Sequence, residues 1–98
     1  MIEQNVRSRD FEGAIVPVLG GGGLLGSAIV EVLALQNAHP VIVDINIDRG
    51  EKLVQNIRKQ NATASFMFAD LSEPDKLVIL IKKIEQHYGV SQGWVNSF

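Results

Sequence analysis

Four consecutive glycines, Gly20 to Gly23, interrupt an aliphatic run and could form a phosphate-binding turn. Glycine tolerates positive φ angles and lets a backbone approach a pyrophosphate closely, and the first turn of a following helix attracts an anion. Gly21-x-Gly23-x-x-Gly26 has the spacing of a dinucleotide turn, and Gly20-x-x-Gly23-x-x-Gly26 has a closely related one. A plain tight turn remains the alternative, because a run of glycines matches such patterns easily.

A carboxylate, Asp44, is the second group that could take part in binding. It ends the aliphatic run HPVIVD, 18 positions after Gly26, where an acidic residue is expected to hydrogen-bond ribose hydroxyls. The alternative is a helix-capping role, since the segment DINID offers several capping candidates. The spacing favours the ribose role.

The elements that would position these residues alternate along the chain. Short apolar runs predict buried strands, and apolar residues at helical spacing predict the helices between them. The predicted strands are 14–19, 39–45, 63–70 and 93–98, and the predicted helices are 24–36, 48–59 and a third from about 72 to 88. The order β-α-β-α-β-α-β predicts an α/β fold with a parallel sheet of about four strands and right-handed crossovers. The first two helices should cover one face of the sheet and the third helix the other.

Composition narrows the function classes. The chain has 98 residues, enough for one small domain, and its 46% hydrophobic and 20% charged residues are typical of a folded globular protein. A net charge of −2 argues against nucleic acid as a partner. No apolar run is long enough to span a membrane, and the polar start lacks a signal sequence, so we expect a cytoplasmic protein. Two isolated histidines and no cysteine predict no metal site.

Four segments in order resemble the N-terminal, NAD(P)-binding part of the short-chain dehydrogenase/reductase family. LGGGGLLG is similar to the family's cofactor turn, VIVDI to its second strand, FADLS to its adenine-binding segment, and HYGVSQGWVNSF to the stretch leading into its fourth strand. The likeness runs from about Gly13 to Phe98, well under half of a typical member. It implies a partial Rossmann fold, so that residues 13–98 would be an incomplete dinucleotide-binding domain preceded by a flexible N-terminal arm, 1–12.

The resemblance also implies the roles of individual residues. Residues 20–25 would present backbone N–H groups to the pyrophosphate, and Gly26 would allow close helix packing. The acidic strand end would flank the adenine ribose, the FADLS segment would bracket the adenine, and the last strand would line the floor near the nicotinamide ribose. The implied cofactor-binding residues are Gly20, Gly21, Gly22, Gly23, Leu24, Leu25, Gly26, Asp44, Ile45, Asp70, Leu71, Asn96 and Ser97.

The same resemblance implies NAD in preference to NADP, because Asp44 has no basic residue directly after it and Arg49 is the nearest. A full-length relative would transfer hydride between nicotinamide and an alcohol or carbonyl substrate. The family's catalytic Tyr-x-x-x-Lys pair is missing, since the only tyrosine, Tyr88, is followed four residues later by Gln92. The chain therefore contains no catalytic residue and is expected to be inactive by itself.

Three departures from the family pattern weaken the cofactor turn. Leu19 stands where the family has a threonine whose hydroxyl ties the turn together, and Ser97 and Phe98 replace Asn-Ala. Pro17 falls in the middle of a predicted central strand, where it removes a ladder hydrogen bond.

The incomplete sheet would leave the edge of its fourth strand exposed, and we expect the chain to self-associate through that edge. Two other functions stay open: a non-catalytic nucleotide-binding or interaction half-domain, and a structural remnant without a ligand.

Overall fold

The computed structural model of the chain describes residues 12–70, 72, 74–88 and 93–97. Its strands are β1 (Ile15–Leu19), β2 (His39–Asp44), β3 (Ser65–Phe68) and β4 (Val95–Asn96), and its helices are α2 (Leu24–Leu35), α3 (Ile47–Lys59) and α4 (Pro74–Tyr88). The strands form one parallel sheet in the order β3-β2-β1-β4. The predicted α/β fold and its β-α-β-α-β-α-β order are confirmed. Apart from Glu12, the predicted N-terminal arm lies outside the described residues.

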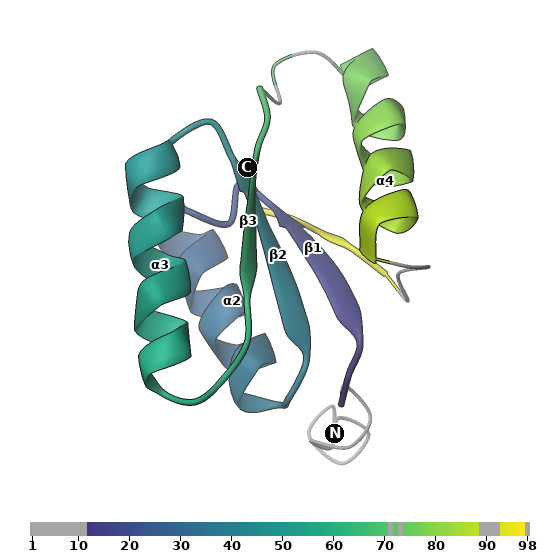
Figure 1. The fold of residues 1–98 in the computed structure, drawn as a ribbon. Coiled ribbons are helices and arrows are strands. Elements are labelled where there is room, and N and C mark those ends of the chain that lie inside the picture. The colour runs from purple at the N-terminus through teal and green to yellow at the C-terminus, as the bar shows by residue number, and fades with distance from the viewer. Residues whose placement is uncertain (1–11, 71, 73, 89–92, 98) are drawn as a thin grey trace, which may run out of the picture.

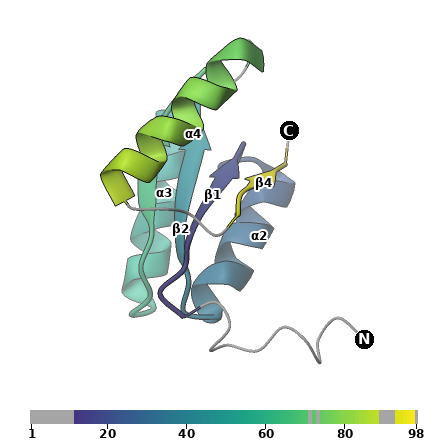
Figure 2. The same ribbon diagram turned by 90° about the vertical axis from the view of Figure 1, so that its right-hand side faces the viewer.

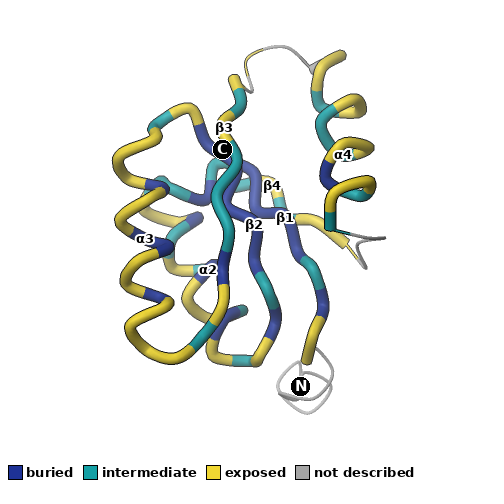
Figure 3. Tube along the Cα trace, viewed as in Figure 1, coloured by how far each residue is buried: buried dark blue, intermediate teal, exposed yellow. Residues whose placement is uncertain are grey.

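Helices cover both faces of the sheet (Figure 1). Successive strand residues point to opposite faces, so Val18 and Ile42 pack with α2 and α3, whereas Leu19, Val41 and Val43 pack against α4. Figure 2 shows α4 crossing one face of the sheet, with α2 on the other side. The central strands β1 and β2 are therefore the most deeply buried part of the molecule (Figure 3).

The two outer strands are shorter than the sequence predicts. The predicted strand 63–70 pairs with β2 only over Ser65–Phe68. The predicted strand 93–98 pairs with β1 only over Val95–Asn96. Each outer strand has one neighbour among the described strands. The pairing of β3 stops at Asp44, the last residue of β2, whereas β1 and β2 both begin before their outer partners do.

A glycine inside α3 has a packing reason. Gly50 is buried, and a Cβ atom at this position would collide with the ring of Phe66 on β3. The helix thereby gives up about 1 kcal/mol of helix propensity, and the aromatic ring lies directly on its backbone.

Pro17 lies in β1, and its position explains why the strand tolerates it. Ala14 O accepts from His39 N and Gly20 N donates to Val43 O, so the even-numbered residues of β1 bond to β2. Leu19 O accepts from Ser97 N, so the odd-numbered residues, Pro17 among them, face β4. The β4 pairing begins only at Val18. The backbone nitrogen of Pro17 therefore faces β4, at a position before the described pairing with β4 begins. The expected loss of a ladder hydrogen bond does not arise there.

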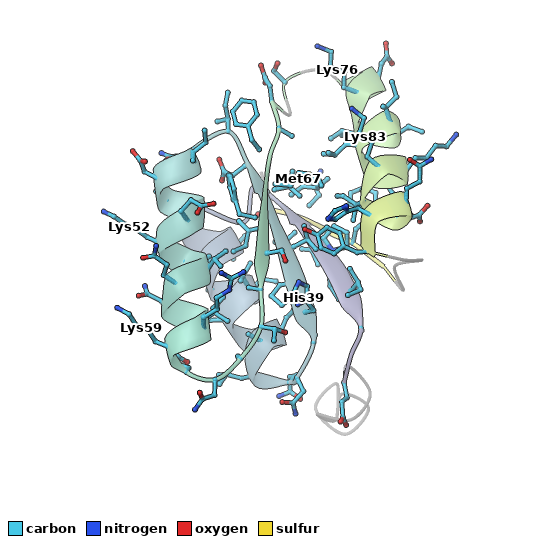
Figure 4. The ribbon with its side chains drawn as sticks, viewed as in Figure 1. His39, Lys52, Lys59, Met67, Lys76 and Lys83 are labelled. Carbon is cyan, nitrogen blue, oxygen red and sulfur yellow. The ribbon has the colours of Figure 1, made fainter. Side chains whose placement is uncertain are left out.

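The end of the sheet opposite the glycine turn carries a small polar cluster. His39 Nε2 lies 2.7 Å from Ser65 Oγ, and the His39 ring packs beside Tyr88 of α4 with a centroid distance of 6.0 Å. Figure 4 shows His39 near this end of the sheet and Met67 between β3 and α4. Burial, assisted by the positive charge of Arg58, lowers the pKa of His39 below its ordinary value.

Candidate nucleotide-binding site

The glycine turn lies where β1 ends, and its own amides are largely used within the protein. Gly20, with a φ of 76°, donates its N–H to Val43 O at 2.7 Å, and Gly21 N donates to Val18 O at 3.1 Å. Gly22 N donates to Asp44 Oδ2 at 3.0 Å, and Gly23 N donates to Gly20 O at 3.1 Å. The structure thus differs from the expectation that every amide from Gly20 to Leu25 is presented to a phosphate, because the turn needs the first four to hold its own shape.

The amides left for an anion are those that open α2. Gly23 is the N-cap and provides no side-chain cap, and the first turn holds no acidic residue. The first helical bond runs from Ser27 N to Gly23 O at 2.8 Å. Within the part of the chain that the structure describes, the N–H groups of Leu24, Leu25 and Gly26 have no hydrogen-bond partner. A helix terminus of this kind is suited to an anion, since its free N–H groups and its dipole act together.

Gly26 lies where α2, the glycine turn and β4 meet. A Cβ atom here would collide with the carbonyl oxygen of Gly20 and would lie 2.7 Å from both Gly21 Cα and Ser97 Oγ. No side chain fits this space without moving backbone, so the absence of a side chain at Gly26 is what brings the helix close to the turn.

Asp44 connects the second strand to the turn. The residue as a whole is only 7% exposed, and its Oδ1 accepts from Asn46 N at 2.9 Å while Oδ2 accepts from Gly22 N. It does not cap α3, because the side chain of Asn46 does so by accepting from Arg49 N at 3.0 Å. A carboxylate has about four acceptor positions, so Asp44 keeps acceptor capacity for a ligand.

A pocket of about 540 Å³ opens at the carboxyl ends of the strands, next to the start of α2. In open α/β sheets ligands bind at this edge, where the strand order reverses, and here it reverses between β1 and β4. The lining residues are Gly20, Gly23, Asp44, Ile45, Arg49, Ala69, Asp70, Ser72 and Ser97.

The predicted site residues are only partly gathered around this pocket. Asp70 is exposed, and the backbone amide of Ser72, which donates to Asp70 Oδ1 at 3.0 Å, lowers the pKa of that carboxyl together with the Ser72 side chain and Lys76. Asn96 is exposed on β4 and is not among the lining residues, and Leu71 lies outside the described residues.

Two features of the pocket were not predicted. Arg49, on the first turn of α3, lines it together with Asp44. The hydroxyl of Ser97 lies 2.8 Å from Leu19 O and 3.1 Å from Gly20 O. Neither feature has a local sequence signal, because each depends on which segments the fold brings to this edge.

The described part of the chain lacks a metal-binding cluster and a membrane-spanning helix. No group of three or more acidic or histidine side chains there is placed to hold a metal ion. None of the helices described is both long and apolar enough to cross a membrane.

Comparison with known proteins agrees with this geometry. A family model for short chain dehydrogenases matches residues 14–97. A short chain dehydrogenase/reductase of Colletotrichum higginsianum is 28% identical over 97 residues, which are 99% of this chain and 36% of that protein.

Solved structures share the fold. L-sorbose reductase from Gluconobacter frateurii, complexed with NADPH and L-sorbose, superposes with a TM-score of 0.78 at 20% identity, covering 90% of this chain and 34% of that one. A putative D-mannonate oxidoreductase from Haemophilus influenza with bound NAD gives a TM-score of 0.74 at 21% identity, covering 96% of this chain and 32% of that one. The chain thus spans about a third of the length of the proteins it matches.

Proposed function

The chain belongs to the short-chain dehydrogenase family and corresponds to part of its NAD(P)-binding region, and on that premise we propose that it binds the ADP-ribose half of a nicotinamide dinucleotide. The observation that carries the proposal is the uncapped start of α2 beside the pocket, with the free amides of Leu24 and Leu25. These amides would bind the pyrophosphate. Asp44 and Ile45 would flank the adenine ribose, with Asp44 accepting from its hydroxyls, and Asp70 would lie beside the adenine.

We further propose that NAD is preferred to NADP. Asp44 is buried and lines the pocket. The 2′-phosphate that NADP carries on its adenine ribose would meet the like charge of the Asp44 carboxylate. Arg49 lines the same pocket and is the group that would offset this repulsion. In the whole protein the bound nicotinamide would exchange hydride with an alcohol or carbonyl substrate. This chain by itself would bind nucleotide without catalysis, since it contains no Tyr-x-x-x-Lys pair.

Calorimetric titration of the chain with ADP-ribose, NAD and NADP tests the site. We expect NAD to bind at least about tenfold more tightly than NADP, and Asp44→Ala to weaken NAD binding by roughly 10- to 100-fold, the worth of hydrogen bonds to a charged acceptor. Asp75→Ala removes the same charge from the first turn of α4, outside the pocket lining, and should leave the affinity unchanged. A folded chain that binds none of the three ligands at millimolar concentration would refute the proposal.

We also propose that the chain self-associates along β4. In the described part of the sheet, β4 is an edge strand beside β1. Four large apolar side chains of α2 are more than half exposed: Leu24, Leu25, Val32 and Leu35. A second copy that paired with β4 would bring its own α2 toward these side chains. Light scattering should give a mass above 10.7 kDa that falls on dilution, and a concentration-independent monomer would contradict the proposal.

A further inference from the structure

The hydroxyl of Ser97, the residue after β4, contacts the backbone where β1 leads into the glycine turn. Ser97 donates its backbone N–H to Leu19 O at 2.9 Å, and its Oγ lies within hydrogen-bond distance of both Leu19 O, at 2.8 Å, and Gly20 O, at 3.1 Å. A serine hydroxyl has one hydrogen to donate, so the two carbonyls share it. Residues 78 positions apart in the chain are thereby joined at the point where β1 becomes the turn.

The Gly20 carbonyl is the one that closes the turn. It accepts from Gly23 N at 3.1 Å, and Gly23 is the N-cap of α2. The orientation of this carbonyl therefore sets how the chain enters the helix whose first amides are free. Leu19, buried on the α4 face, has no hydroxyl with which to fix the turn from its own strand.

The Ser97 hydroxyl occupies the space next to Gly26. A Cβ atom on Gly26 would lie 2.7 Å from Ser97 Oγ, closer than any real side chain packs. The absence of a side chain at Gly26 therefore leaves room for the Ser97 hydroxyl, which contacts the Leu19 and Gly20 carbonyls.

We propose that Ser97 is a positioning residue for the nucleotide: its hydroxyl holds the Gly20 carbonyl inward, so that the amides of Leu24 and Leu25 face the phosphates. This inference rests on the proposed nucleotide site. It adds a role toward the protein backbone to the place that Ser97 has in the lining of the pocket.

Three variants test the role in the full chain. Ser97→Ala should lower the affinity for ADP-ribose about tenfold, the scale of one buried hydrogen bond, and Ser97→Thr, which keeps the hydroxyl, should restore it to within about threefold. Ser65→Ala is the matched control, because it also removes a serine hydroxyl that takes part in a hydrogen bond, here the one with His39 at the opposite end of the sheet. Its ADP-ribose affinity should equal that of the wild type.

Amide hydrogen exchange provides a second measurement that needs no ligand. The Gly23 amide should exchange about tenfold faster in Ser97→Ala than in the wild type and at the wild-type rate in Ser65→Ala. A folded Ser97→Ala chain with wild-type affinity and wild-type Gly23 exchange overturns the inference while the proposed function stands. If the wild type binds no ADP-ribose, the proposed function fails and so does the nucleotide role of Ser97. Faster exchange of Gly23 would then support only the hold on the turn.

Discussion

Replacing Gly26 with alanine adds one methyl group at the most crowded point of the site. That methyl would collide with the Gly20 carbonyl and would crowd Gly21 Cα and Ser97 Oγ, each at 2.7 Å. Overpacking costs about 1–3 kcal/mol, and the upper end applies here because the neighbours are backbone atoms and a hydrogen-bonded hydroxyl. Alanine returns about 1 kcal/mol of helix propensity, which leaves a net loss of about 2 kcal/mol.

For a domain of this size, that loss lowers Tm by roughly 8–16 °C. Thermal unfolding followed by circular dichroism measures it, and titration of the folded variant with ADP-ribose should show at least about tenfold weaker binding, since the turn must move to admit the methyl. Gly93→Ala is the matched control, because a Cβ atom there meets nothing within 4 Å, and its stability should change by less than about 0.5 kcal/mol. A Gly26→Ala chain with the Tm and affinity of the wild type would refute the packing argument.

Two other regions give predictions of definite sign. Gly50→Ala should lower the free energy of unfolding by about 1–2 kcal/mol in urea titrations, because the new methyl group meets the Phe66 ring. In an exposed helix the same change would raise the free energy of unfolding. A more stable variant would show that the contact with Phe66 does not limit the residue at this position. His39 has a pKa below its ordinary value of 6.5, so the unfolded chain binds a proton at His39 more readily than the folded chain does. Neutral His39 therefore makes its full contribution to stability above pH 6.5, and that contribution is lost as the pH falls below this value. The fall in Tm between pH 7.5 and 5.5 should be smaller in His39→Gln, and an identical fall in both proteins would rule out His39 as a source of it.

Periodic features of the sequence were enough to predict the elements and their order. Apolar runs of four to six residues, as in Ile15–Leu19 and His39–Asp44, favour strands buried on both faces, and the pattern of Ile47–Lys59 favours a helix that buries one side. The sequence predicted too great a length for β3 and β4, because their apolar residues do not show how far each strand pairs with its neighbour. A segment is a strand only where it pairs with a neighbouring strand, and the length of that pairing cannot be predicted from the residues of the segment alone.

Some features of the candidate site could likewise be predicted from the sequence, and others are visible only in the folded structure. The glycine spacing and the acidic end of β2 are visible in the sequence alone, because turn geometry and strand ends are local properties of the chain. Only the tertiary structure decided which amides stay free, since the bond from Gly22 N to Asp44 Oδ2 depends on two strands ending side by side. Only it showed that Pro17 faces the short β4 ladder and that Ser97 supports the turn. Local sequence determines what each segment can become, and contacts between distant segments depend on strand order and register, which exist only once the chain has folded.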